Sequence, residues 1–74
     1  VPVLSYRIFN GVAYITTKFP HAFAVNDSVQ LNGVGALNGT FTVATVPNNT
    51  NFTIAVSSGD VDSTTVSGAT ATKQ

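Results

Sequence analysis

The sequence predicts an all-β domain: a small six-stranded antiparallel β-barrel or sandwich built from hairpins. Three observations carry this prediction. Hydrophobic residues make up 43% of the chain, and many of them are Val, Ile or Phe, which favour strands as the abundant Thr does. No segment has a sustained apolar stripe with the 3.6-residue period of a helix. Short apolar runs alternate with turn residues, at a spacing typical of small β-domains.

The length of 74 residues predicts a single domain, residues 1–74, near the size at which burial only just offsets the lost chain entropy. The sequence has no cysteine for a disulfide, so either the core is well packed or neighbouring chains or domains share the stabilisation. It does not begin with Met, so we expect a fragment of a longer protein. The net charge is zero, which argues against nucleic acid and membrane partners, since both require basic patches.

The first two strands are predicted within residues 3–17, "VLSYRIFNGVAYITT". Asn10-Gly11 suits the two-residue type I′ turn of a hairpin, because both turn positions need a positive φ. That turn predicts three cross-strand pairs on the solvent side, namely Ser5–Thr16, Arg7–Tyr14 and Phe9–Val12. The opposite side is apolar and is predicted to be core: Leu4, Tyr6, Ile8, Ala13 and Ile15.

Residues 18–27 are predicted to form a crossing loop. We expect Phe19 and Phe23 to pack onto the end of the barrel. The ring of His21 is expected to bond to backbone where the loop ends, and Asp27 to cap the turn before the next strand.

A short strand and a glycine-rich turn follow. The strand at residues 28–32 should turn Val29 and Leu31 inward, while Leu37 fills the turn at 33–39. Glycine at Gly33 suits a tight turn, and Asn38-Gly39 is expected to supply left-handed geometry at the entry to the next strand.

A second hairpin is predicted from residues 40–46 and 51–56 around the loop "PNNT". A four-residue loop predicts the pairs Phe41–Val56, Val43–Ile54 and Thr45–Phe52. This register places the large apolar side chains on one face, where we expect core: Phe41, Val43, Phe52, Ile54 and Val56. Residues 57–65 should form a polar loop. Residues 66–73 should form the last strand, an edge strand protected from pairing by Lys73 alone.

Few residues are suited to catalysis or metal binding. His21 is the single histidine, and with Asp27 nearby it is more simply a turn residue than a catalytic one. Asp60 and Asp62 are too few ligands for a calcium loop. The sequons at Asn26, Asn38, Asn48 and Asn51 are those that a protein of Asn turns and Thr strands contains by chance. We therefore predict no enzyme activity, no catalytic or cofactor-binding residue, no metal ligand and no cofactor.

One frame of residues has a familiar pattern. It comprises His21, Phe23, Val25, Asp27, Val29, Leu31 and Gly33, followed by "LNGTFTV" at 37–43 and "NFTI" at 51–54. This frame resembles small β modules of bacteriophage structural proteins, tail-associated ones above all, which sequence profiles link to the β-barrel of the first catalytic-cysteine half-domain of ubiquitin-activating enzymes. The resemblance covers about residues 12–56. It implies a virion building module without catalytic residues.

The resemblance and the composition together predict a non-enzymatic structural module of a phage virion, in the tail, a fibre or the baseplate. Its expected partners are copies of itself and neighbouring virion proteins, in a symmetric homo-oligomer. The alternative is a module of a phage fibre or bacterial surface protein that binds a host-surface glycan through loops 18–27 and 57–65. An exposed pair of aromatic rings in those loops would favour the alternative.

Overall fold

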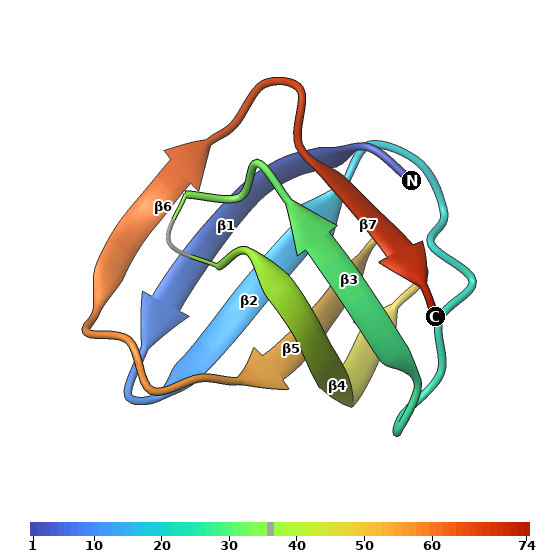
Figure 1. Ribbon diagram of the computed structural model, residues 1–74, viewed down its shortest axis with the longest axis horizontal. Helices are drawn as coiled ribbons and strands as arrows, with labels where there is room; N and C mark the ends of the chain where they lie inside the picture. Colours follow the sequence, from blue (N-terminus) through green and yellow to red (C-terminus); the bar gives the residue numbers. More distant parts are fainter. Residues whose placement is uncertain (36) are drawn as a thin grey trace.

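The computed structural model describes residues 1–35 and 37–74 and contains seven strands (Figure 1). They are β1 (Val3–Phe9), β2 (Val12–Thr17), β3 (Ser28–Asn32), β4 (Gly39–Asn48), β5 (Asn51–Ala55), β6 (Val61–Thr65) and β7 (Thr70–Lys73). The strands form one antiparallel sheet in the order β6-β1-β2-β5-β4-β3-β7, which is not closed into a barrel. The predicted small all-β fold is confirmed, with seven strands in place of six. No helix of the described residues is long and apolar enough to cross a membrane.

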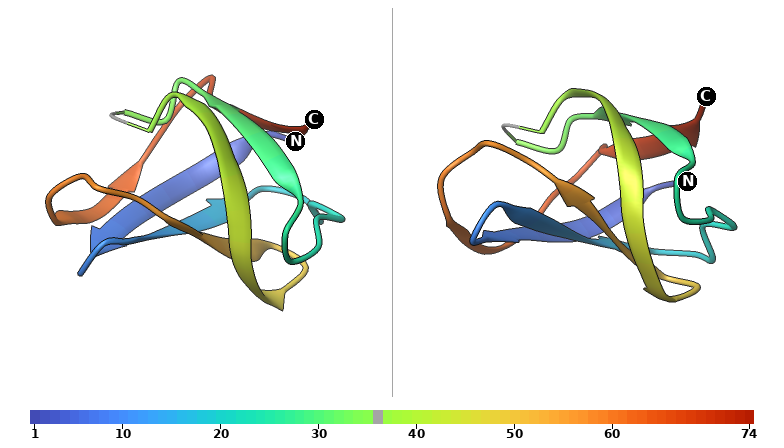
Figure 2. Two further views of the ribbon diagram at one scale, coloured as in Figure 1. Left: turned by 60° about the horizontal axis from the view of Figure 1, so that its bottom comes forward. Right: turned by 90° about the horizontal axis from the view of Figure 1, so that it is seen from below.

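The sheet folds over on itself into two layers (Figure 2). One layer contains β6, β1, β2 and β5, the other contains β3 and β7, and β4 runs from one to the other. The first part of β4 pairs with β3, with Phe41 opposite Val29, and the second part pairs with β5, with Val43 opposite Ile54. Its pairing with β5 is irregular on both sides of Thr45, and such bulges bend a strand. The bend lets one strand serve both layers.

The last strand is paired on both sides, contrary to the predicted open edge. On one side β7 pairs with β3. On the other, the Ala71 N–H donates to the Val1 carbonyl at 2.8 Å, and the Val3 N–H donates to the Ala69 carbonyl at 2.9 Å. The free edge of the described sheet is β6, which pairs with β1 alone.

The first hairpin has the predicted turn and register. Asn10 and Gly11 have φ values of 53° and 77°, and the pairs run as expected from Phe9–Val12 to Ser5–Thr16. The register shifts beyond Ser5, where Val3 lies opposite Thr17. Val3 is therefore buried and Leu4 is 41% exposed, so the prediction of Leu4 as core is wrong.

The second hairpin follows the predicted register only at Val43 and Ile54. Thr45 lies opposite Thr53 rather than Phe52, and β4 continues to Asn48, which lies opposite Asn51. The Asn48 Oδ1 accepts from the Thr50 N–H at 3.0 Å and from the Asn51 Nδ2 at 3.0 Å. These bonds stabilise a two-residue turn in place of the predicted four-residue loop.

Side chains from both layers meet in one core. Of the predicted core residues, those fully enclosed are Tyr6, Ile8, Ile15, Val29, Leu31, Val43, Phe52 and Ile54, and Ala13 and Leu37 join them. Phe41 and Val56 are only half-buried and pack against this core. Phe41 lies opposite Val29 of β3 rather than opposite Val56, which lies beyond the end of β5. Phe19 does not pack as predicted and is 61% exposed.

Strand β6 lies within the segment predicted to be a polar loop. Val61 is the only apolar residue of this strand, and the four residues that follow it are exposed. An edge strand with so little buried surface has no alternating hydrophobic pattern, which explains why the sequence did not reveal it.

We predict that Val43→Ala lowers the free energy of unfolding by about 1–3 kcal/mol, because Val43 is fully buried where β4 bends between the layers. Urea unfolding followed by circular dichroism measures the loss. Val25→Ala is the matched control, since Val25 is 51% exposed and should change stability by less than about 0.5 kcal/mol. Equal losses in the two variants would contradict this packing.

Candidate functional site

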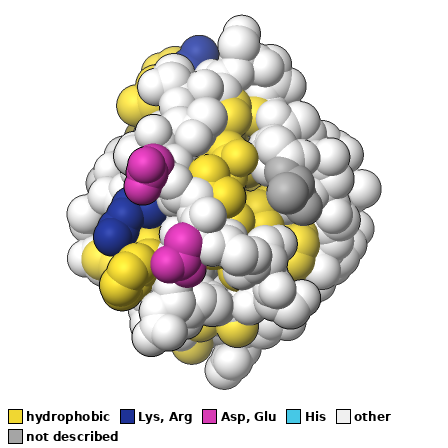
Figure 3. Space-filling view, turned by 90° about the vertical axis from the view of Figure 1, so that its left-hand side faces the viewer, with side chains coloured by type: hydrophobic (Ala, Val, Ile, Leu, Met, Phe, Trp, Pro, Cys, Tyr) yellow, Lys and Arg dark blue, Asp and Glu magenta, His cyan; other side chains and the backbone are white. Residues whose placement is uncertain are grey.

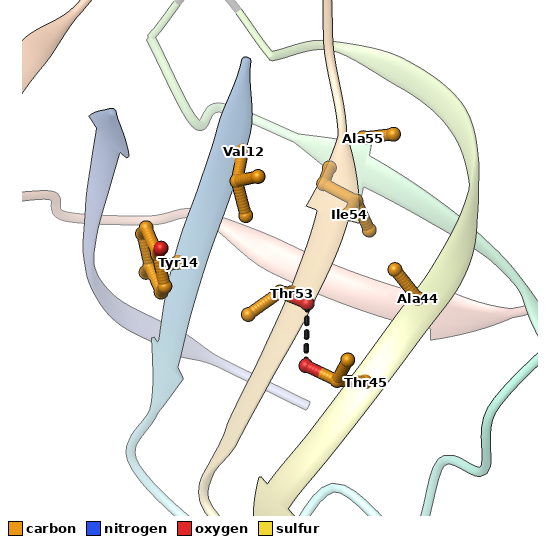
Figure 4. A pocket seen from close by; sticks show the side chains of 7 residues that line it. All are labelled: Val12, Tyr14, Ala44, Thr45, Thr53, Ile54 and Ala55. Carbon is orange, nitrogen blue, oxygen red and sulfur yellow. Dashed lines mark hydrogen bonds between the residues drawn. The ribbon is translucent and has the colours of Figure 1, made fainter. Parts of the chain in front are cut away.

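A groove lies on the solvent-facing side of β2, β5 and β4, which we call the outer groove (Figure 4). It encloses about 290 Å³ and is lined by Val12 and Tyr14 of β2, Thr53, Ile54 and Ala55 of β5, and Ala44 and Thr45 of β4. The small alanine side chains on β5 and β4 leave the groove open between larger neighbours. It can therefore receive an apolar side chain.

The bulge in β4 forms the far wall of the outer groove. Because the register shifts between Val43 and Thr45, the Thr45 side chain lies beside Thr53 on the outer side. The two hydroxyl oxygens are 2.6 Å apart and form a hydrogen bond, drawn in Figure 4. Thr53 is buried, and this bond satisfies its polar atom at the base of the groove.

Two aromatic rings and one guanidinium lie beside the outer groove. The Arg7 Cζ is 5.1 Å from the centroid of the Phe9 ring and 5.4 Å from that of the Tyr14 ring. The expected pairing of Arg7 with Tyr14 is confirmed. Phe9 is 51% exposed and Tyr14 is 41% exposed, so this cluster projects into solvent.

The loop at 18–27 is anchored by His21, whose two ring nitrogens both bond to backbone. The His21 Nδ1 accepts from the Phe23 N–H at 2.9 Å, and Nε2 lies 3.0 Å from the carbonyl oxygens of Asn48 and Asn51. This network assigns the ring proton to Nε2. The ring stacks on Phe23 and meets Phe52 edge-on, at centroid distances of 5.2 and 5.3 Å. The expected bonding of His21 to backbone is confirmed.

Asp27 and Asp60 stabilise turns, and Asp27 also forms an ion pair. The Asp27 Oδ2 accepts from the Ala24 N–H at 2.8 Å, which confirms the expected cap, and it lies 3.6 Å from the Lys73 Nζ. The Asp60 Oδ1 accepts from the Asn10 N–H at 3.0 Å. Within residues 1–35 and 37–74, no three His, Cys, Asp or Glu side chains gather as metal ligands.

Asparagine and glycine shape the turns. Gly33 and Gly39 have φ values of 72° and 126°. The prediction that Asn38 is left-handed is wrong, because its φ is not positive. The Asn38 Oδ1 instead accepts from the Gly33 N–H at 2.9 Å, which holds the turn closed. The Asn51 Oδ1 accepts from the Thr16 hydroxyl at 2.7 Å.

The outer groove was not foreseen from the sequence. The predicted register placed Thr45 opposite Phe52, facing the core, and a one-residue shift moves a side chain to the other face of a sheet. A polar Thr at an expected core position was the available signal.

Comparison with protein-family models, with curated proteins and with solved structures finds no match to this chain.

We predict that His21→Ala destabilises the chain by about 1–3 kcal/mol, because it leaves the Phe23 N–H and two carbonyl oxygens without their ring partner. Hydrogen exchange at the Phe23 amide should accelerate in the same variant. Lys18→Ala, on the exposed part of the loop, is the control. Unchanged exchange at Phe23 would exclude the anchoring role.

Proposed function

We propose that this chain is a non-enzymatic structural module of a bacteriophage virion, in the tail, a fibre or the baseplate, that packs against other protein chains. The observation that carries the proposal is the outer groove with the exposed rings of Phe9 and Tyr14 beside it. The resemblance of residues 12–56 to phage structural modules supports the virion as the place where this packing occurs.

The exposed rings are not needed for the chain's own core. Ile8, Ile15 and Phe52 fill the inner side of the same sheet layer and are fully buried. Fully burying an exposed aromatic ring gains about 1.5–3 kcal/mol. Phe9 and Tyr14 are 51% and 41% exposed, so contact with another molecule would gain part of this free energy for each ring. Contiguous exposed apolar surface of this kind marks protein interaction sites.

Glycan binding is the second candidate. The Tyr14 ring lies beside the hydroxyls of Thr45 and Thr53, and a sugar can stack on a ring and bond to hydroxyls. These two hydroxyls already bond to each other. In the crossing loop Phe19 is exposed but Phe23 packs on His21 and Phe52, so the described loop presents one ring rather than a pair. Protein packing is therefore the stronger candidate.

We predict that the parent protein is a stoichiometric component of virus particles. The particles would be purified on a density gradient from the virus or lysogen that encodes this sequence, and their proteins quantified by mass spectrometry. Peptides of this chain should co-sediment with the major tail proteins at a fixed ratio. Absence of the peptides from intact particles would overturn the virion assignment.

We predict no binding above background when the folded chain is applied to a glycan array, because the outer groove is mainly apolar and its two hydroxyls are paired. If a glycan signal is observed, Tyr14→Ala tests whether the signal comes from the outer groove. Binding that disappears in Tyr14→Ala, while Phe19→Ala still binds, would move glycan recognition ahead of packing.

A further inference from the structure

We propose that the outer groove receives Phe9 from a second copy of this chain, in a two-fold symmetric, face-to-face pair. The proposal rests on the proposed packing function and names its partner. The contact surface is the solvent-facing side of β1, β2, β5 and β4, which we call the outer face.

Phe9 and the open part of the groove lie on the two strands that flank β2, one on each side. Strands β1 and β5 flank β2 on either side. Phe9 on β1 and Ala55 on β5 both lie opposite Val12, so the three residues form one row across the sheet. A two-fold axis above β2 and nearly parallel to it exchanges the places of β1 and β5. Each exposed Phe9 ring then lies over the other copy's Ala55, where the groove is open.

The next row is compatible with the same axis. Arg7, Tyr14 and Thr53 lie opposite one another on β1, β2 and β5. The two Tyr14 rings meet at the axis, an arrangement that aromatic pairs favour. Each Arg7 then lies over Thr53 on β5 of the other copy. The two guanidiniums lie on opposite sides of the axis, about 10 Å apart across it, and each remains over its own Phe9 and Tyr14 rings.

The size of the outer face predicts a weak pair. It is the broad side of the molecule, on the far side in Figure 1 and opposite the β3–β7 layer in Figure 2. The two longer extents of the whole chain are 27 and 24 Å, so the rectangle that encloses this side has an area of about 650 Å² and the contact area is smaller. Standard specific interfaces bury about 800 Å² on each partner. We therefore expect a dimer that forms at high protein concentration.

Pairing of two copies through the free edge of β6 is disfavoured. Figure 3 views the molecule from the side of β6 and displays two acidic side chains there. Asp62 lies within β6 and Asp60 directly before it, and both are exposed. Joining two β6 edges would bring the Asp62 carboxylates of both copies to the joined edges, and charged side chains on an edge block such pairing. The outer face, whose strands carry one Arg and no carboxylate in the described part, has no such barrier.

Sedimentation equilibrium over a range from about 10 μM to 1 mM tests the association. The wild-type chain should shift from monomer to dimer across this range. Phe9→Ala and Ala55→Arg should each weaken the dimer by about tenfold or more, because the first removes the inserted ring and the second fills its place. Phe19→Ala removes a ring that is 61% exposed, more than Phe9, and that lies outside the outer face, so it should leave the dimer constant within about twofold. Circular dichroism verifies that each variant is folded.

Cross-linking tests the position of the axis. The chain has no cysteine, so Val12→Cys introduces a single thiol next to the axis. A short bismaleimide should link two Val12→Cys chains faster than two Ser67→Cys chains, since Ser67 lies in the exposed segment between β6 and β7.

Three results would overturn the second-copy proposal. The first is a wild-type chain that remains monomeric at 1 mM. The second is a dimer that Phe9→Ala and Ala55→Arg leave unchanged. The third is equal cross-linking of the two cysteine variants. A monomeric chain that is nevertheless found in purified particles would refute the self-pairing while leaving the virion assignment intact.

Discussion

The double pairing of β4 is the constraint on which the rest of the structure depends. A ten-residue strand pairs with β3 at one end and β5 at the other, and so joins the two layers around one core. A regular strand would continue in one sheet, so β4 has to bend. The bulges on both sides of Thr45 produce the bend, and Val43 directly before them is fully enclosed. The residues around Thr45 therefore determine both how the two layers enclose the core and where the outer groove forms.

The same constraint limits what can be predicted from the sequence. The hairpin at Asn10-Gly11 was predictable almost completely, because the turn fixes the loop length and the loop length fixes the register. The register of the second hairpin held only at Val43 and Ile54. Nothing local in "TVATVPNN" reveals that the strand must leave one partner for another. A shift of one residue at Thr45 then moved the Thr45 side chain from the expected core side to the outer side, where it lines the outer groove.

Other departures from the prediction arise from contacts between distant segments. Alternation from Ile8 and Tyr6 would turn Leu4 inward, but the register shift between Val3 and Ser5 turns Val3 inward instead. At this point the Val3 N–H donates to the Ala69 carbonyl, which joins segments at opposite ends of the chain. Similarly, β6 forms beside β1 although its side chains are mostly exposed, so its existence depends on backbone pairing and not on burial. Such long-range pairing leaves no local pattern.

The fold explains the position of the outer groove but not its composition. A bulge in β4 accounts for the space between β4 and β5, and polar side chains on either strand would have satisfied the fold equally well. The groove instead carries Ala44 and Ala55. The exposed Tyr14 ring lines the groove from β2, and the exposed Phe9 ring lies on β1, two strands from β5. Small residues beside a protruding ring make a surface complementary to itself after a half-turn. Contact with another chain, as proposed above, would account for the apolar character of this face.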